Sequence, residues 1–147
     1  WLCGGDGGTY RCCVASPGSV RARDGVVLIS PALATAQVHG GMGMGSGWAL
    51  YGELLVDPAT GRVNNNNLLD YKFPTTCDIP DLACAFVETQ EPSGVYGNKS
   101  LGEPPLISPA PALRNAVLDA TGVAVNAIPM TPKLLFEEFV KAGLIKG

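Results

Sequence analysis

The chain has 147 residues, a formal net charge of −3 at pH 7, and 46% hydrophobic and 16% charged residues. This length fits one domain with a buried core, and this composition argues against wholesale disorder. The negative charge gives no indication of a nucleic-acid surface, and no run of about 18 apolar residues predicts a membrane span. We therefore expect a globular, cytoplasmic protein with neither nucleic acid nor membrane as a partner.

The cysteine and histidine content limits metal chemistry within this chain. The sequence has 5 cysteines without a C-x-x-C pair, which argues against a disulfide framework and against a zinc or iron–sulfur site. His39 is the single histidine, so a self-contained zinc or non-haem iron site would lack ligands. We predict no metal-ligating residue, and we interpret His39 as a packed or surface side chain rather than a general base.

Residues 1–25 show no sustained hydrophobic period of either a strand or a helix. We treat them as an atypical leader, separate from the domain expected over residues 26–147. Three explanations remain open for this leader: disorder, a truncation, or a reading-frame error upstream of Gly25. The last two are preferred, because the patterned sequence begins abruptly.

The stretch after the leader gives conflicting local signals. Residues 25–29 form a short β-branched run that predicts a buried strand, and Ser30 followed by Pro31 is typical of a helix start. Residues 32–55 combine helix-forming flanks with five glycines between Gly40 and Gly47. Two interpretations remain open for this stretch: a flexible glycine linker, or a helix whose glycines let its backbone approach a bulky ligand.

The rest of the chain gives clearer signals. Residues 57–61 have the composition of a hairpin turn, and residues 85–89 predict a further strand. Residues 108–122 predict a helix with serine and proline at its start, apolar residues at helical spacing and a glycine at its end. Residues 131–143 predict a second helix with the same kind of start and stop.

Glu103 stands between Gly102 and two prolines, Pro104 and Pro105. The glycine is conformationally free and each proline fixes its own φ, so the chain itself holds this carboxylate on a stiff turn. We expect Pro104 to keep Glu103 out of the helical region. From chemistry alone, a solvated surface glutamate is the simpler interpretation, and a carboxylate aimed into a cleft is the alternative.

Several segments, in the same order, resemble the xanthine dehydrogenase/aldehyde oxidase family of molybdenum hydroxylases. The central segment contains the pattern Lys-x-x-Gly-Glu-Pro-Pro, which is similar to the active-site segment of that family. The other segments lie on both sides of it. The matching ranges are 96–106 at the centre, 36–41 and 47–51 upstream, and 111–117, 119–122 and 129–132 downstream.

The resemblance implies an α+β fold, as the C-terminal portion of a molybdopterin-binding domain with a mixed sheet and flanking helices. It implies a helix across the glycine-rich stretch and a molybdenum–molybdopterin cofactor. Glu103 stands at the position of the catalytic base. Gln37, Gly40 and Gly41 match the segment that faces the cofactor. Lys99 could offer charge to the cofactor or pair with a surface carboxylate, and we favour the second role.

The implied activity is that of a xanthine dehydrogenase-like oxidoreductase. It hydroxylates a small molecule, a purine or other N-heterocycle or an aldehyde, with water as the oxygen source. The resemblance also implies iron–sulfur and FAD centres in other domains or subunits, and the remainder of the molybdenum-binding subunit as a partner. We therefore expect this fragment to be inactive alone. The alternative is a non-catalytic scaffold or interaction fragment that retains the fold.

Overall fold

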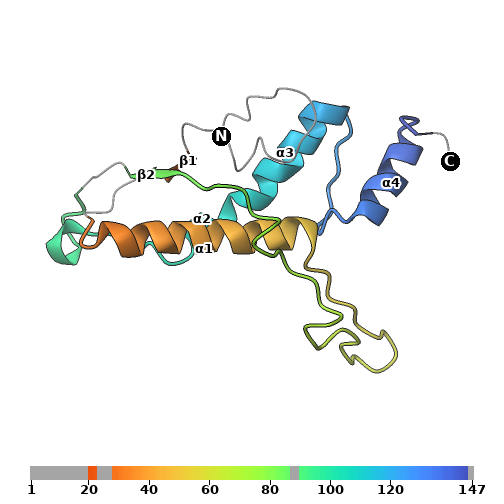
Figure 1. The fold of residues 1–147 in the computed structure, drawn as a ribbon, viewed down its shortest axis with the longest axis horizontal. Coiled ribbons are helices and arrows are strands. Elements are labelled where there is room, and N and C mark those ends of the chain that lie inside the picture. The colour runs from red at the N-terminus through yellow and green to blue at the C-terminus, as the bar shows by residue number, and fades with distance from the viewer. Residues whose placement is uncertain (1–19, 23–27, 87–89, 146–147) are drawn as a thin grey trace.

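The longest element of the computed structural model is a helix, α1, against which two further helices and one strand lie (Figure 1). The structure describes residues 20–22, 28–86 and 90–145. The elements in chain order are β1 (Val20–Ala22), α1 (Pro31–Leu50), β2 (Cys84–Phe86), the 3-10 turn η2 (Val95–Gly97), α2 (Pro104–Ile107), α3 (Pro109–Thr121) and α4 (Pro132–Lys141).

The glycine-rich stretch is helical throughout, so the helix is confirmed and the flexible linker is wrong. Pro31 occupies the first helical position, and the carbonyl of Ser30 accepts a hydrogen bond of 3.0 Å from the amide of Ala34. The five glycines cost about 1 kcal/mol each relative to alanine, or about 5 kcal/mol together. Local propensity does not explain this helix, so its stability has to come from packing against the rest of the chain.

A single apolar core joins α1 to α3 and to the segment that follows α3. Its buried members come from three parts of the chain and include the fully buried Leu113 and Met130. They are Val38, Met42, Ala49, Leu113, Val117, Val125, Met130 and Leu135. The buried face of α1 is therefore covered by residues that lie far along the sequence.

The predicted helix over residues 108–122 is confirmed as α3, which ends at Gly122 with φ 71°. Arg114 of α3 fixes the connection to α4: its Nε donates to the carbonyl of Val125 at 3.2 Å, and its Nη2 donates to Oδ1 of Asn126 at 2.7 Å. Ser108 makes no side-chain cap bond, because α2 leads into α3 with Ser108 in a helical conformation.

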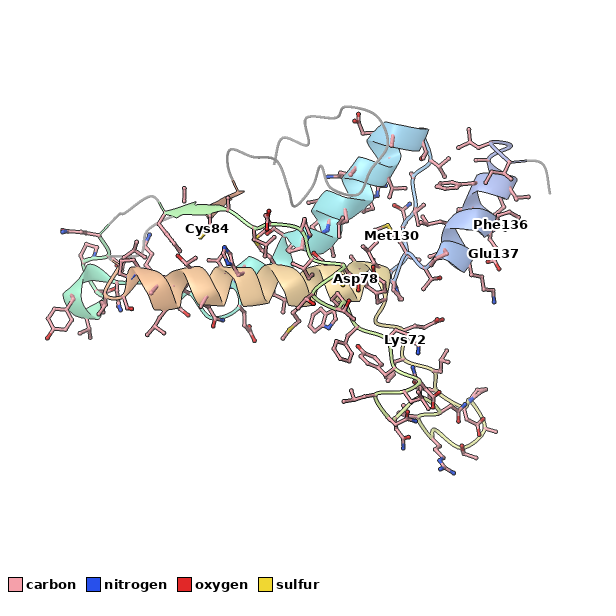
Figure 2. The ribbon with its side chains drawn as sticks, in the orientation of Figure 1. Lys72, Asp78, Cys84, Met130, Phe136 and Glu137 are labelled. Carbon is pink, nitrogen blue, oxygen red and sulfur yellow. The ribbon has the colours of Figure 1, made fainter. Side chains whose placement is uncertain are left out.

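The predicted helix over residues 131–143 is confirmed as α4. The Thr131 hydroxyl accepts a hydrogen bond of 3.3 Å from the amide of Leu134, and Gly143 follows the helix with φ 75°. Leu135 reaches the core, whereas Phe136 projects outward (Figure 2) and is 51% exposed. α4 is thus held mainly through one face and through the connection that precedes it.

The strands are short in the part of the chain that the structure describes. β1 and β2 pair in parallel, with Val20 opposite Cys84, and the one other pairing is an isolated antiparallel bridge between Val56 and Val63. The full mixed sheet is therefore not present within these residues. The strand predicted over 25–29 is wrong at its described end: Leu28 and Ile29 are not in a strand, and residues 25–27 lie outside the described residues.

The strand predicted over 85–89 is confirmed at its start, which lies in β2, while residues 87–89 lie outside the described residues.

The hairpin turn predicted over 57–61 is confirmed. Asp57 N donates to Arg62 O and Gly61 N donates to Asp57 O, both at 2.8 Å, and Gly61 has φ 70°. This hairpin belongs to a long connection that extends beyond the C-terminal end of α1, with Lys72 between α1 and the tip of the connection (Figure 2).

Many large apolar side chains are exposed on this chain. Leu33 and Trp48 of α1 are 72% and 51% exposed, and Leu68 and Leu69 of the long connection are 78% and 81% exposed. Large apolar side chains that gather on an exposed surface mark contact with other protein or a ligand. None of the helices in the described ranges is long and apolar enough to cross a membrane.

We expect Leu113→Ala to lower the free energy of unfolding by about 2 to 5 kcal/mol, because it removes a fully buried side chain from the centre of the core. Urea titration of the chain, followed by circular dichroism, measures this change. Leu33→Ala is the matched control, since Leu33 is exposed and should change the free energy by less than about 0.5 kcal/mol. Equal effects of the two variants would contradict this description of the core.

Candidate functional site

One face of α1 lies against the segment that contains Glu103. Gln37, Gly41 and Gly45 are spaced by four residues, which places them one above the other on a helix. The segment 102–109, which includes α2 and the start of α3, runs along this face (Figure 1). The structure therefore brings together the two stretches that carry the predicted site residues.

Gln37 joins these two stretches directly. Its Nε2 donates a hydrogen bond to the carbonyl oxygen of Gly102, at 2.5 Å, across 65 residues of sequence. The accepting carbonyl belongs to the residue immediately before Glu103. A glutamine amide has two N–H donors and an acceptor oxygen. The bond to Gly102 thus leaves one N–H group and Oε1 for a further partner.

Gly41 and Gly45 form what we call the glycine notch, because side chains at these positions would collide with the 102–109 segment. A Cβ atom on Gly41 would lie 2.7 Å from the Cβ of Pro105, and one on Gly45 would lie 2.7 Å from the carbonyl oxygen of Leu106. Separations below about 3 Å are not tolerated without movement of the backbone. These two glycines therefore permit close approach to the chain's own backbone.

Gly40 differs from its neighbours, because a Cβ atom on it would meet nothing within 4 Å. Gly40 and Gln37 are both exposed, on adjacent turns of α1. The open surface at Gly40 and the remaining amide groups of Gln37 fit the polar edge of a pterin, which needs hydrogen-bond partners and room beside the helix. The residues present thus fit the cofactor that the resemblance implies, and Gly41 contributes by packing.

Glu103 lies directly before α2 with φ −97° and ψ −21°, so the expectation that Pro104 would exclude it from the helical region is wrong. The physical reason is tertiary packing. The Glu103 carbonyl accepts a hydrogen bond of 2.8 Å from Leu106 N, and Pro105 is buried against Gly41. The Glu103 side chain is exposed. A closed pocket around this carboxylate requires atoms from beyond the described residues.

A tight turn precedes the Glu103 segment. Tyr96 has φ 55°, which is uncommon for a residue other than glycine, and Gly97 follows with φ 71°. The amide of Glu91 donates to the Gly97 carbonyl at 3.0 Å and closes this turn. Hydrogen bonds from Ser93 hold the pKa of Glu91 below its ordinary value, and the charge of Lys99 adds a smaller contribution. The surface-pairing role of Lys99 stays a prediction.

His39 is half-buried, and its Nε2 has no hydrogen-bond partner among the described residues. The described ranges hold no cluster of three or more His, Cys, Asp or Glu side chains suited to a metal ion. Of the cysteines, Cys77 and Cys84 are described, and both are free thiols. Cys84 lies on β2 (Figure 2).

The sequence interpretation missed the part that Gly45, Pro105 and Pro109 play. A Cβ atom on Gly45 would lie 2.9 Å from Cγ of Pro109, so this pair belongs to the same interface as Gly41 and Pro105. The signal was present in the spacing, because Gln37, Gly41 and Gly45 share one helical face. The sequence interpretation explained these glycines by the close approach of a ligand, whereas in the structure they permit the close approach of residues 105–109.

The chain is similar in sequence to a known protein family and to molybdenum-binding subunits. Residues 19–80 match the family described as the molybdopterin cofactor-binding domain. Over 118 residues the chain is 61% identical to the putative xanthine dehydrogenase molybdenum-binding subunit XdhA of Escherichia coli K12, and the alignment covers 80% of this chain and 16% of that protein. Over 112 residues it is 36% identical to the aldehyde oxidoreductase molybdenum-binding subunit PaoC of the same organism, covering 76% and 15%.

A solved structure shows the same relationship. Quinoline 2-oxidoreductase from Pseudomonas putida 86 superposes with a TM-score of 0.70 and 31% sequence identity, over 77% of this chain and 15% of that one. The chain therefore spans about one sixth of the length of the proteins it matches.

We expect Ser93→Ala to raise the pKa of Glu91 toward its ordinary value. The Ser93 hydroxyl and amide donate to the Glu91 carboxylate at 2.7 and 3.2 Å and are the main cause of its lowered pKa. A lowered pKa in the folded state stabilises above the unfolded pKa, and this contribution is lost as the pH falls through the folded-state pKa. The variant should therefore lose stability at neutral pH and approach the parent chain in acid.

Carbon-13 NMR titration of the side-chain carboxyl groups measures the pKa of Glu91. Ser100→Ala is the control, because Ser100 is an exposed serine of the same region without a hydrogen bond to Glu91 among the described contacts. An unchanged Glu91 pKa in Ser93→Ala would show that these hydrogen bonds do not hold the turn in solution.

Proposed function

Because the chain belongs to the xanthine dehydrogenase/aldehyde oxidase family of molybdenum hydroxylases, we propose that it supplies the catalytic base and part of the cofactor surface of such an enzyme. Residues 26–147 would be the C-terminal part of a molybdopterin-binding domain, completed by a mixed sheet with flanking helices. The observation that carries the proposal is the hydrogen bond from Gln37 to the carbonyl of Gly102. It joins the proposed cofactor segment to the residue before the proposed base.

The proposed reaction is hydroxylation of a purine, another N-heterocycle or an aldehyde, with water as the oxygen source. When bound, the molybdenum–molybdopterin cofactor supplies the oxidising power for this reaction. The relatives' names support this range, since one is a xanthine dehydrogenase subunit and another an aldehyde oxidoreductase subunit. Glu103 acts as the general base: its carboxylate takes a proton from a donor held within about 3 Å.

The remaining site residues have supporting roles in this proposal. Gln37 presents its free N–H group and Oε1 to the polar edge of the cofactor, and Gly40 leaves room for the cofactor beside the helix. Gly41 supports the same part of α1 by packing against Pro105. In this proposal, the metal takes no ligand from this chain.

The proposed partners follow from the surfaces that this chain exposes. The exposed Glu103 side chain and the exposed apolar residues of α1 support contact with the remainder of the molybdenum-binding subunit. Iron–sulfur and FAD centres in other domains or subunits would accept the electrons. The chain alone would then be inactive. A cytoplasmic location stays a prediction, and nothing in the matches favours the alternative of a non-catalytic scaffold.

In the complete enzyme, we expect Glu103→Gln to lower kcat by about 10² to 10⁴, since the amide has the shape of the carboxylate but cannot take the proton. Molybdenum and pterin contents should remain at the parent level, measured by metal analysis and by fluorescence of the oxidised pterin. Glu91→Gln is the matched control, because Glu91 is a carboxylate of the same region placed in the preceding turn. Parent-level turnover in Glu103→Gln would remove Glu103 from the mechanism.

A further inference from the structure

We propose that Gln37 is a positioning residue for Glu103: its amide fixes the carbonyl group before the base, and the glycine notch sets how closely that segment lies against α1. This inference rests on the proposed function of Glu103 as the base. It adds a second task for Gln37, in which the same amide would contact the cofactor on one side and the base segment on the other.

The Gln37 amide can bind two partners at once. Nε2 of Gln37 has two N–H groups, and one donates to the Gly102 carbonyl at 2.5 Å. The N–H groups and Oε1 lie in one plane, so a partner that binds the free half of the amide also orients the half that holds Gly102. Binding of the cofactor at Gln37 would therefore restrain the segment that carries Glu103.

The segment is also held on the other side of Glu103. Pro105 is buried and follows Glu103 after one residue, and it lies where a side chain on Gly41 would be. The hydrogen bond at Gly102 and the packing at Pro105 therefore clamp Glu103 from both sides. Both clamps come from the same face of α1, at positions 37 and 41.

Backbone contacts take the place of side-chain contacts in positioning Glu103. The Glu103 side chain is exposed and forms no hydrogen bond or ion pair of its own within the described residues. Its position is therefore set through its backbone. A displacement of about 1 Å in a reacting group costs on the order of 10² in rate. A backbone clamp of this kind is a physical means of preventing such a displacement.

The test compares variants of this chain in the complete molybdenum-binding enzyme. Gln37→Met keeps the length of the side chain but removes the amide, and Gln37→Glu keeps the polarity but removes the N–H donor. Gly41→Ala adds a methyl group against Pro105 and leaves Gln37 intact. Gly43→Ala is the matched control: it makes the same chemical change on the same helix, where the new Cβ would meet Ile79 Cδ1 at an ordinary 3.9 Å.

The readout that does not depend on turnover is hydrogen–deuterium exchange of the peptide that covers residues 101–107. Pro104 and Pro105 have no amide proton, so the signal reports Gly102, Glu103 and Leu106 with their neighbours. We expect exchange in this peptide to be about fivefold faster in both Gln37 variants, which corresponds to the loss of one net hydrogen bond. In the parent enzyme, loading with cofactor should slow this exchange, and Gln37→Met should remove that difference.

For the kinetics, we expect Gly41→Ala to lower kcat by about 10²-fold with KM little changed, and molybdenum and pterin contents to stay at the parent level. Gly43→Ala should match the parent in all measurements. Parent-like exchange and kcat in Gly41→Ala would overturn the proposal. Loss of molybdenum in the Gln37 variants with unchanged exchange at 101–107 would also overturn it, because Gln37 would then act on the cofactor alone.

These outcomes are separate from the failure of the proposed function. An active Glu103→Gln enzyme would show that Glu103 is not the base, whatever the Gln37 variants do. Exchange at residues 101–107 would still report whether Gln37 restrains the segment, because that measurement needs no catalysis. If Gly41→Ala does not fold, the two Gln37 variants still test the proposal. Because Gln37 is exposed, we expect both of them to fold.

Discussion

The close packing of α1 against the 102–109 segment is the interaction on which the rest of the structure depends. Gly41 and Gly45 let the helix backbone approach Pro105 and Leu106 within distances that any side chain would prevent. The same glycines weaken α1 locally, by about 1 kcal/mol each relative to alanine. The helix is therefore stable because of the contact, and the contact is possible because of the glycines that weaken the helix. Each depends on the other.

This interface also explains where the candidate site lies. Gln37 is one helical turn before Gly41, and its hydrogen bond to the Gly102 carbonyl continues the line of contact beyond the packed prolines. Glu103 is thus placed next to a regular helix and is followed by α2, instead of lying in an isolated loop. Sites supported by regular elements hold their geometry better than sites on loops alone. The exposed side of this arrangement is where the remainder of the subunit and the cofactor are proposed to bind.

The sequence predicted those elements whose signals are local. The helix over 108–122 carries its own proline start and glycine stop, and the turn over 57–61 carries its own turn residues, so both could be predicted without tertiary information. The prediction of a strand over 25–29 is wrong at Leu28 and Ile29, because a short apolar run does not show whether a neighbouring strand is present to pair with it. The helix over 31–50 was ambiguous for a similar reason: Gly41 and Gly45 are explained only by their contacts with residues 105–109, which lie far along the chain.

The candidate site was predictable in its residues but not in its geometry. Gln37 and Glu103 were named from the resemblance, and no local rule indicates that the amide of one would bond the carbonyl before the other. The backbone of Glu103 also differed from expectation, because burial of Pro105 outweighs the steric preference of the residue before a proline. The roles of these residues remain proposals, whereas their proximity is a property of the fold.

Among the described residues, the partners that secure α1 come from the second half of the chain, and this has a consequence for synthesis on the ribosome. The helix ends at Leu50, yet the carbonyl of Ala49 accepts its bond from the amide of Met130, and the notch is filled by residues 105–109. A glycine-rich helix gains little from propensity while these partners are still untranslated. The nascent chain therefore cannot complete this helix early. The core closes only after the segment around Met130 has left the ribosome.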